Sequence, residues 1–168
     1  MEIEKKKLYE LNRRAFPDEI CFKPIGIILT PFKTLKGIPI QSSISKVKGR
    51  IEIFKDYENA LKDLEKFSHI YCIYHFDLIK LPVPLQSKPF LDNTKKGVFA
   101  IRTPFRPNPI GLSIFEILQI KKNVIDILGV DVLDKTPVLD IKPYVSEFDH
   151  RSQTKNGWLN GKVKYKES

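Results

Sequence analysis

The sequence predicts a mainly β protein, folded as a single β-barrel-like domain with one or two helices. At least five segments have the alternating or β-branched pattern of strands, whereas one segment has a clear helical pattern. Strands and helices do not alternate regularly, and no G-x-G-x-x-G follows a strand-like segment. Both observations argue against a doubly wound nucleotide-binding fold and favour a β-dominated barrel.

Two regions are distinguished along the chain. Residues 1–20 are predicted to form an N-terminal helical extension, because three apolar residues share one helical stripe and Pro17 ends it. Residues 21–168 are predicted to form the barrel domain. This division places every strand-like segment in the second region.

The strands follow one another through the barrel region. Alternating or β-branched composition predicts strands over residues 23–30, 47–54, 68–78, 97–101, 111–120, 123–130 and 138–141. The short charged connection at residues 121–123 predicts a hairpin. The one clear helix is expected over residues 56–67, with Asp56 as its N-cap and an apolar face formed by Tyr57, Leu61, Leu64 and Phe67.

The charge of the chain indicates a possible class of partner. The formal net charge is +9, and the first 20 residues contain five basic and five acidic side chains, so the excess resides in residues 21–168. Residues 33–50 contain several lysines and an arginine but no acid, and the C-terminal end is also basic. Such blocks favour a polyanion such as RNA, although a lysine-rich soluble surface is an equally ordinary explanation.

Metal, disulfide and membrane functions are not indicated. Cys21 and Cys72 are too few for a disulfide framework, and the three histidines have no metal-ligand spacing, so we expect no metal site. The longest uncharged apolar runs are too short to cross a bilayer, and the N-terminus lacks the apolar core of a secretory signal. We therefore expect a cytoplasmic protein with no membrane partner.

Residues 97–111, GVFAIRTPFRPNPIG, form the most distinctive segment. Its prolines fix the backbone and remove N–H donors, which predicts a stiff turn suited to the wall of a binding site. Arg102 and Arg106 can bind a carboxylate or phosphate, and the amide of Asn108 can both donate and accept hydrogen bonds. The ordinary alternative is a proline-rich loop whose arginines are merely solvated.

Two long motifs indicate a family. The run FAIRTPFRPNPIGLS resembles the signature of the TsaA-like family, the tRNA threonylcarbamoyladenosine (t6A) N6-methyltransferases also called TrmO. The later run GVDVLDKTPVLDIKPYVSEFD resembles a second block of that family, and KPIGIILTPF and IPIQ resemble its opening strand and loop. The match covers roughly residues 23–149, and the order of the blocks is that of the family.

The resemblance implies an S-adenosyl-L-methionine-binding β-barrel unrelated to the Rossmann methyltransferases, with a site shared between the two protomers of a homodimer. Carried over by position, and with Asn108 added as a candidate, the cofactor-binding residues are Pro39, Ile40, Gln41, Phe76, Asp77, Arg102, Asn108, Leu112, Asp134, Lys135, Thr136 and Pro137. Two of them depart from the family pattern, because Ile40 stands where arginine is usual and Lys135 where glycine is usual.

Physical roles can be assigned to some of these residues. Arg102 can pair with the methionine carboxylate, and burying it without an anionic partner would be costly. Asp77 or Asp134 can accept from ribose hydroxyls or from the ammonium group, and Leu112 can form an apolar wall for adenine. The ordinary alternatives are a simple turn at Asp134 and plain core positions at Leu112 and Phe76.

The implied reaction is methylation of N6 of t6A at position 37, with the tRNA anticodon stem-loop as the partner. A proton must leave this nitrogen, so a carboxylate should help, and the candidate catalytic residues are Asp131, Asp134 and Asp140. The sequence does not separate the three. The alternatives are an S-adenosyl-L-methionine-binding protein with a different methyl acceptor, a non-catalytic basic RNA-binding module, and a small-molecule or metal-responsive binding protein.

Overall fold

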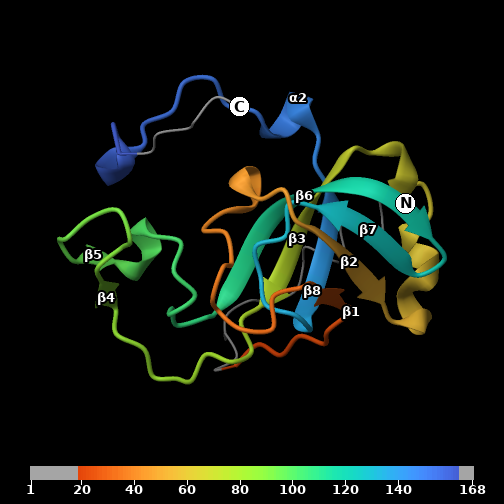
Figure 1. Ribbon diagram of the computed structural model, residues 1–168, viewed down its shortest axis with the longest axis horizontal. Helices are drawn as coiled ribbons and strands as arrows, with labels where there is room; N and C mark the ends of the chain where they lie inside the picture. The colour runs from red at the N-terminus through yellow and green to blue at the C-terminus, as the bar shows by residue number, and fades with distance from the viewer. Residues whose placement is uncertain (1–18, 163–168) are drawn as a thin grey trace, which may run out of the picture.

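The fold is a closed six-stranded barrel. The computed structural model describes residues 19–162, and within them the barrel strands follow the order β1-β2-β7-β6-β3-β8, each antiparallel to its neighbours (Figure 1). Their bounds are β1 (Gly26–Leu29), β2 (Lys48–Ile53), β3 (His69–His75), β6 (Ile110–Lys121), β7 (Val124–Leu128) and β8 (Thr136–Pro143). The predicted mainly β class is confirmed. The helical extension expected over residues 1–20 lies almost entirely outside the described residues.

The core consists of side chains that point inward from alternate positions of the strands. In β3 every second residue is buried, and β6 buries alternate residues through its first half. The inward side chains of the six strands meet in one apolar cluster, which includes the fully buried Ile28, Ile51, Ile70, Phe115, Ile125, Ile127 and Val138. Burying an aliphatic or aromatic side chain of this size contributes about 1.5–3 kcal/mol, so this cluster is the main source of stability.

The predicted hairpin is confirmed. Lys121 of β6 pairs with Val124 of β7, which leaves Lys122 and Asn123 as the turn. Lys122 adopts a left-handed conformation with φ of 54°. The side-chain amide of Asn123 donates to the Ile53 carbonyl oxygen at 2.7 Å, which ties the turn to the end of β2. The hairpin thus connects three neighbouring strands of the barrel.

The helix expected over residues 56–67 is wrong. The segment forms two 3-10 helices, η2 (Lys55–Leu61) and η3 (Leu64–Lys66), separated at Asp63, which has φ of 68°. Asp56 is not the N-cap, because Phe54 occupies that position. Leu61 and Leu64, which pack on the core, are three residues apart, which is the period of a 3-10 helix and not of an α-helix.

The strand expected over residues 97–101 is also wrong. Its start pairs as β5 (Lys96–Gly97) with β4 (Gln86–Ser87) in a separate two-stranded sheet, and the chain continues as the 3-10 helix η4 (Val98–Ala100). Val98 and Ile101 are buried whereas Phe99 is 82% exposed, so the burial follows a spacing of three, not two. Figure 1 shows the β4-β5 sheet on an arm that extends away from the barrel.

Short helical segments complete the described chain. They are η1 (Ser42–Ile44) between β1 and β2, α2 (Ser146–Asp149) after β8, and η5 (Gly157–Leu159) near the end. None of the helices in residues 19–162 is both long and apolar enough to span a membrane.

Candidate functional site

One large cavity opens at the side of the barrel where several loops meet. Its volume is about 1730 Å³, which exceeds the ~300–1,000 Å³ of a typical small-molecule site. The register of the sheet explains why the loops meet there. Tyr74 near the end of β3 pairs with both Gly111 at the start of β6 and Val138 near the start of β8, so the loops attached to these strand ends lie close together.

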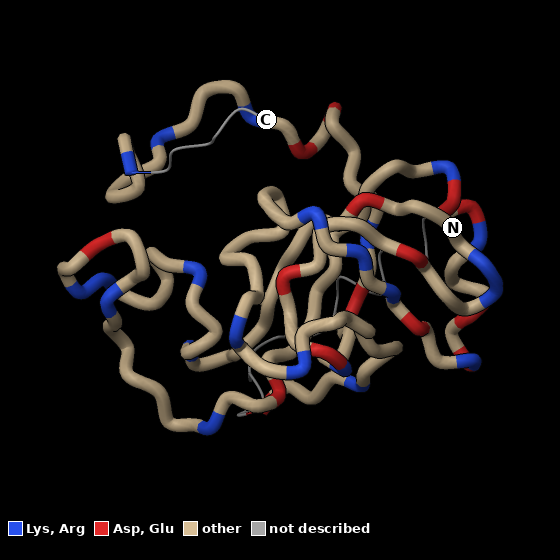
Figure 2. The backbone as a smooth tube through the Cα atoms, viewed as in Figure 1, with Lys and Arg blue, Asp and Glu red and all other residues tan. Residues whose placement is uncertain are grey.

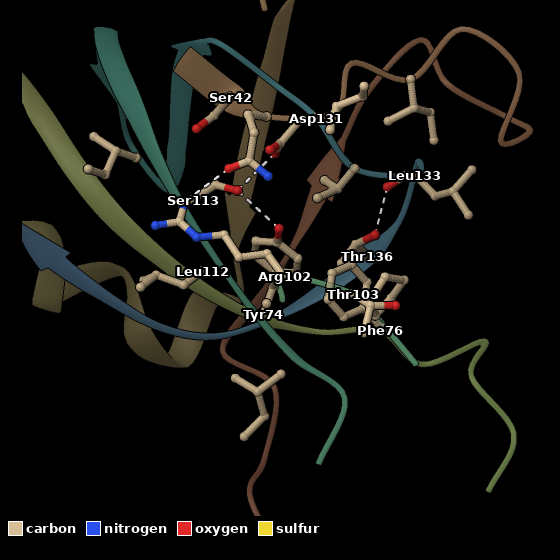
Figure 3. Close-up of a pocket in the computed structure, with 18 of the residues that line it drawn as sticks. Ser42, Tyr74, Phe76, Arg102, Thr103, Leu112, Ser113, Asp131, Leu133 and Thr136 are labelled. Carbon is tan, nitrogen blue, oxygen red and sulfur yellow. Dashed lines mark hydrogen bonds between the residues drawn. The ribbon is translucent and has the colours of Figure 1, made fainter. Parts of the chain in front are cut away.

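Most of the predicted site residues line this cavity. They are Ile40, Gln41, Phe76, Asp77, Arg102, Asn108, Leu112, Asp131, Asp134, Lys135 and Thr136. Figure 3 labels five of them, Phe76, Arg102, Leu112, Asp131 and Thr136. Pro39 and Pro137 are neighbours of lining residues in the sequence but do not line the cavity themselves. Asp140 does not line it either, and its carboxylate forms an ion pair with Lys142 at 2.8 Å.

Arg102 joins two distant segments across the cavity. Its Nη1 donates to Oε1 of Gln41 at 2.9 Å, although the two residues are 61 positions apart. The guanidinium is exposed, so the argument that Arg102 would be buried and would require an anionic partner is wrong. The side chain is instead held by a neutral amide, which leaves its positive charge available to an anionic ligand.

The apolar residues of the cavity have different surroundings. Leu112 is 59% exposed on the outer face of β6, so the plain-core explanation for this residue is wrong. Phe76 packs on the core and also lines the cavity, with its ring edge-to-face against Tyr74 at 5.2 Å between centroids. Together they supply an apolar wall suited to a flat aromatic ligand.

Asp134 is a fully partnered carboxylate. Its Oδ1 accepts from the backbone N–H of Thr30 at 3.0 Å, and its Oδ2 accepts from Lys33 Nζ at 2.5 Å. The Lys33 ammonium lowers the pKa of this carboxyl below its ordinary value. Asp134 therefore anchors the loop before β8 to the end of β1.

Lys135 takes over the backbone role of a glycine. Its φ is 66°, in the left-handed region that favours glycine, and its N–H donates to the Ile28 carbonyl at 2.7 Å. The departure from the family pattern at this position therefore leaves a glycine-like backbone in place.

Asp131 lies at the end of a hydrogen-bonded chain that the sequence did not reveal. Its Oδ1 accepts from the Ser113 hydroxyl at 2.8 Å, and the Tyr74 hydroxyl lies 3.0 Å from the same Ser113 oxygen (Figure 3). Burial raises the pKa of Asp131 to about 6, although hydrogen bonds from Ser113 and from the backbone of Ser42 oppose the shift. The available signal was a serine in the buried register of β6, between Gly111 and Phe115.

Comparisons with known proteins agree on one family. The family model described as the tRNA-methyltransferase O N-terminal domain matches residues 27–150. A probable S-adenosyl-L-methionine-binding protein of Pyrococcus abyssi is 49% identical over 150 residues, which cover 89% of this chain and 81% of that protein.

Two further proteins that this chain resembles are named as a tRNA methyltransferase and as TrmO. The tRNA (adenine(37)-N6)-methyltransferase of Escherichia coli is 38% identical over 134 residues, 74% of this chain and 57% of that protein. The crystal structure of TrmO from Pseudomonas aeruginosa superimposes with a TM-score of 0.69 at 32% identity, covering 83% of this chain and 62% of that chain. This chain therefore spans less than two thirds of the length of both.

The buried carboxylate generates a prediction about stability. The pKa of Asp131 rises from 3.8 in its ordinary state to about 6 in the folded protein. Between these values the unfolded chain is ionised while the folded protein keeps its proton, so stability falls as pH rises through this window. Asp131→Asn should therefore stabilise the protein by up to about 3 kcal/mol at pH 7.5, with the gain shrinking toward pH 4.

Urea unfolding at several pH values measures this effect. Asp63→Asn is the matched control, because the Asp63 carboxylate is 55% exposed and pairs with Lys66 at the surface. A loss of stability in Asp131→Asn at pH 7.5 would contradict the assigned burial cost.

Proposed function

Because this chain belongs to the tRNA-methyltransferase O N-terminal domain family, we propose that it is an S-adenosyl-L-methionine-dependent methyltransferase that acts on N6 of t6A at position 37 of tRNA. The observation that supports the proposal most is the convergence, in one cavity, of the residues at the family's cofactor positions. With tRNA as the substrate, the cytoplasm is the compartment we propose.

The residues present fit the cofactor chemically. S-adenosyl-L-methionine would supply a methyl carbon bonded to a positively charged sulfur. Its methionine carboxylate suits the exposed guanidinium of Arg102, and its ribose hydroxyls or ammonium suit the carboxylate of Asp77. Leu112 and Ile40, which are 59% and 55% exposed, offer apolar surface to the adenine. Ile40 thus replaces the usual arginine with an apolar wall, and Arg102 with Arg106 remain as the arginines of the cavity lining.

A basic stripe beside the cavity supports RNA as the macromolecular substrate. Lys46, Lys48 and Arg50 are exposed at alternate positions leading into and along β2, where Figure 2 shows a run of basic residues. Lys48 pairs in register with Leu128, which lines the cavity, so phosphates held by the stripe would lie near the cavity mouth. Arg50 is partly neutralised by Asp126, at 3.1 Å.

We also propose a homodimer with the site at its interface. The arm that carries β4 and β5 exposes large apolar side chains, among them Leu85 at 66%, Phe90 at 84% and Phe99 at 82%. Exposed apolar surface of this kind favours a protein partner. Phe99 also lines the cavity, so a second protomer placed against the arm would close the site.

Removing the arginine should weaken cofactor binding. We expect Arg102→Ala to raise the Kd for S-adenosyl-L-methionine by about tenfold to 100-fold, since a hydrogen bond to a charged group contributes about 1.5–3 kcal/mol. Isothermal titration calorimetry measures the change. Arg151→Ala is the control, because that guanidinium is exposed and bonds the backbone carbonyl of His150. Unchanged affinity in Arg102→Ala would remove Arg102 from the cofactor site.

The acceptor can be tested with tRNA that carries or lacks the threonylcarbamoyl group. With methyl-labelled cofactor, we expect labelling of the t6A-containing tRNA alone, and labelling that decreases as salt rises because phosphate contacts contribute to affinity. Equal labelling of both pools would reject t6A as the acceptor. Cofactor binding without labelling of either pool would favour a different acceptor or a non-catalytic RNA-binding role.

The dimer proposal predicts a defined mass in solution. Sedimentation equilibrium at micromolar concentration should give twice the mass of the chain, and Phe90→Asp should shift it toward the monomer because it places a charge in the apolar contact. A monomeric wild-type protein with full cofactor affinity would exclude a shared site.

A further inference from the structure

The glycine of the signature has a specific steric role. Gly111 pairs directly with Tyr74 across β6 and β3. A Cβ atom at position 111 would lie 2.0 Å from Cε2 and 2.4 Å from Cζ of the Tyr74 ring, far inside van der Waals contact. The tyrosine ring can therefore lie across β6 only because residue 111 has no side chain.

This placement carries the tyrosine hydroxyl to the next inward position of β6. Ser113 is two residues beyond Gly111 on the same face, and its Oγ lies 3.0 Å from the Tyr74 hydroxyl. Ser113 donates its single hydroxyl proton to Asp131 Oδ1, so Tyr74 is the donor to Ser113. The chain of hydrogen bonds therefore runs from Tyr74 through Ser113 to Asp131, and both Tyr74 and Ser113 are only 4% exposed.

The surroundings separate the three candidate aspartates. Asp134 has both oxygens occupied, by Thr30 and by Lys33, and Asp140 is paired with Lys142 away from the cavity. Asp131 lines the cavity, has Oδ1 held by Ser113, and takes part in no ion pair with any residue that the structure describes. Burial without a cationic partner favours the protonated form of Asp131.

We infer that Asp131 accepts the proton that leaves the methylated nitrogen, and that Ser113 and Tyr74 are positioning residues that hold its carboxylate toward the cavity. The inference rests on the proposed methyltransferase function. As the bond forms between the nitrogen and the methyl carbon, the bond from that carbon to sulfur breaks and its electron pair stays on sulfur. The N–H proton passes to the carboxylate of Asp131, whose Oδ1 Ser113 holds in place.

The groups facing Asp131 determine how its protonation responds to substitution. The β6 strand contributes Ser113, β3 contributes Tyr74 and the buried thiol of Cys72, and η1 contributes the backbone of Ser42. Arg102 lines the same cavity and is bonded to Gln41. The Ser113 hydrogen bond lowers the pKa of Asp131, so its removal raises that pKa and moves the rise of activity to higher pH.

The test is the pH dependence of methyl transfer to t6A-containing tRNA, measured as kcat/KM. For the wild type we expect activity to rise with pH through about 6, the pKa of Asp131, and then to level off. Asp131→Asn should lose about 100-fold or more. Ser113→Ala should shift the rise to higher pH, Tyr74→Phe should shift it less, and Ser113→Thr, which keeps the hydroxyl, should restore the wild-type profile.

Cofactor affinity, measured by calorimetry without tRNA, should stay within about twofold in all four variants. Asp63→Asn is the control for kcat/KM, because it lies in a surface ion pair outside the cavity. Wild-type activity retained in Asp131→Asn, or an unshifted profile in a folded Ser113→Ala, would overturn this inference alone. Absence of methyl transfer in the wild type would overturn the proposed function and this inference with it.

Discussion

The site depends on the close contact between the Tyr74 ring and the bare backbone of Gly111. Any side chain at position 111 would displace the ring, and the tyrosine hydroxyl would then lose its partner Ser113. Because the two residues are paired across antiparallel strands, the contact is set by the register of the barrel and not by a flexible loop. The proline-rich segment leads directly into this position, so the same short stretch of sequence supplies both the loop that carries Arg102 and the strand that positions Asp131.

Two carboxylates three positions apart have opposite environments. Lys33 and a backbone N–H hold Asp134 ionised, whereas burial makes Asp131 keep its proton more tightly. Such a divergence is a frequent property of catalytic sites, where one group fixes structure or charge and another exchanges a proton. The ionised Asp131 lowers the stability of the fold. The barrel tolerates this cost because the many fully buried apolar side chains of its core stabilise it.

The sequence predicted the strands well and the short helical turns poorly. Alternation or β-branched composition identified every barrel strand, and the short charged connection at residues 121–123 identified the hairpin. The errors at residues 56–67 and 97–101 share a feature, since burial in both segments follows a spacing of three, the period of a 3-10 helix. Ser113 was missed for a related reason. A polar residue in a buried register becomes informative only when its partners, Tyr74 and Asp131, are known to lie beside it.

The arrangement of charges across the cavity is consistent with a direct methyl transfer between two bound molecules. Arg102 belongs to the proline-rich segment, and its guanidinium donates a hydrogen bond to Gln41. Asp131 lies after β7, and its carboxylate accepts a hydrogen bond from Ser113 of β6. A displacement at carbon requires the nucleophile to approach opposite the leaving sulfur, so a site that holds the two molecules on separate elements can supply much of the rate through alignment. The cavity exceeds the volume of a typical single-ligand site. A single barrel that presents an arginine to one molecule and a carboxylate with a raised pKa to the other meets both requirements of the reaction we propose.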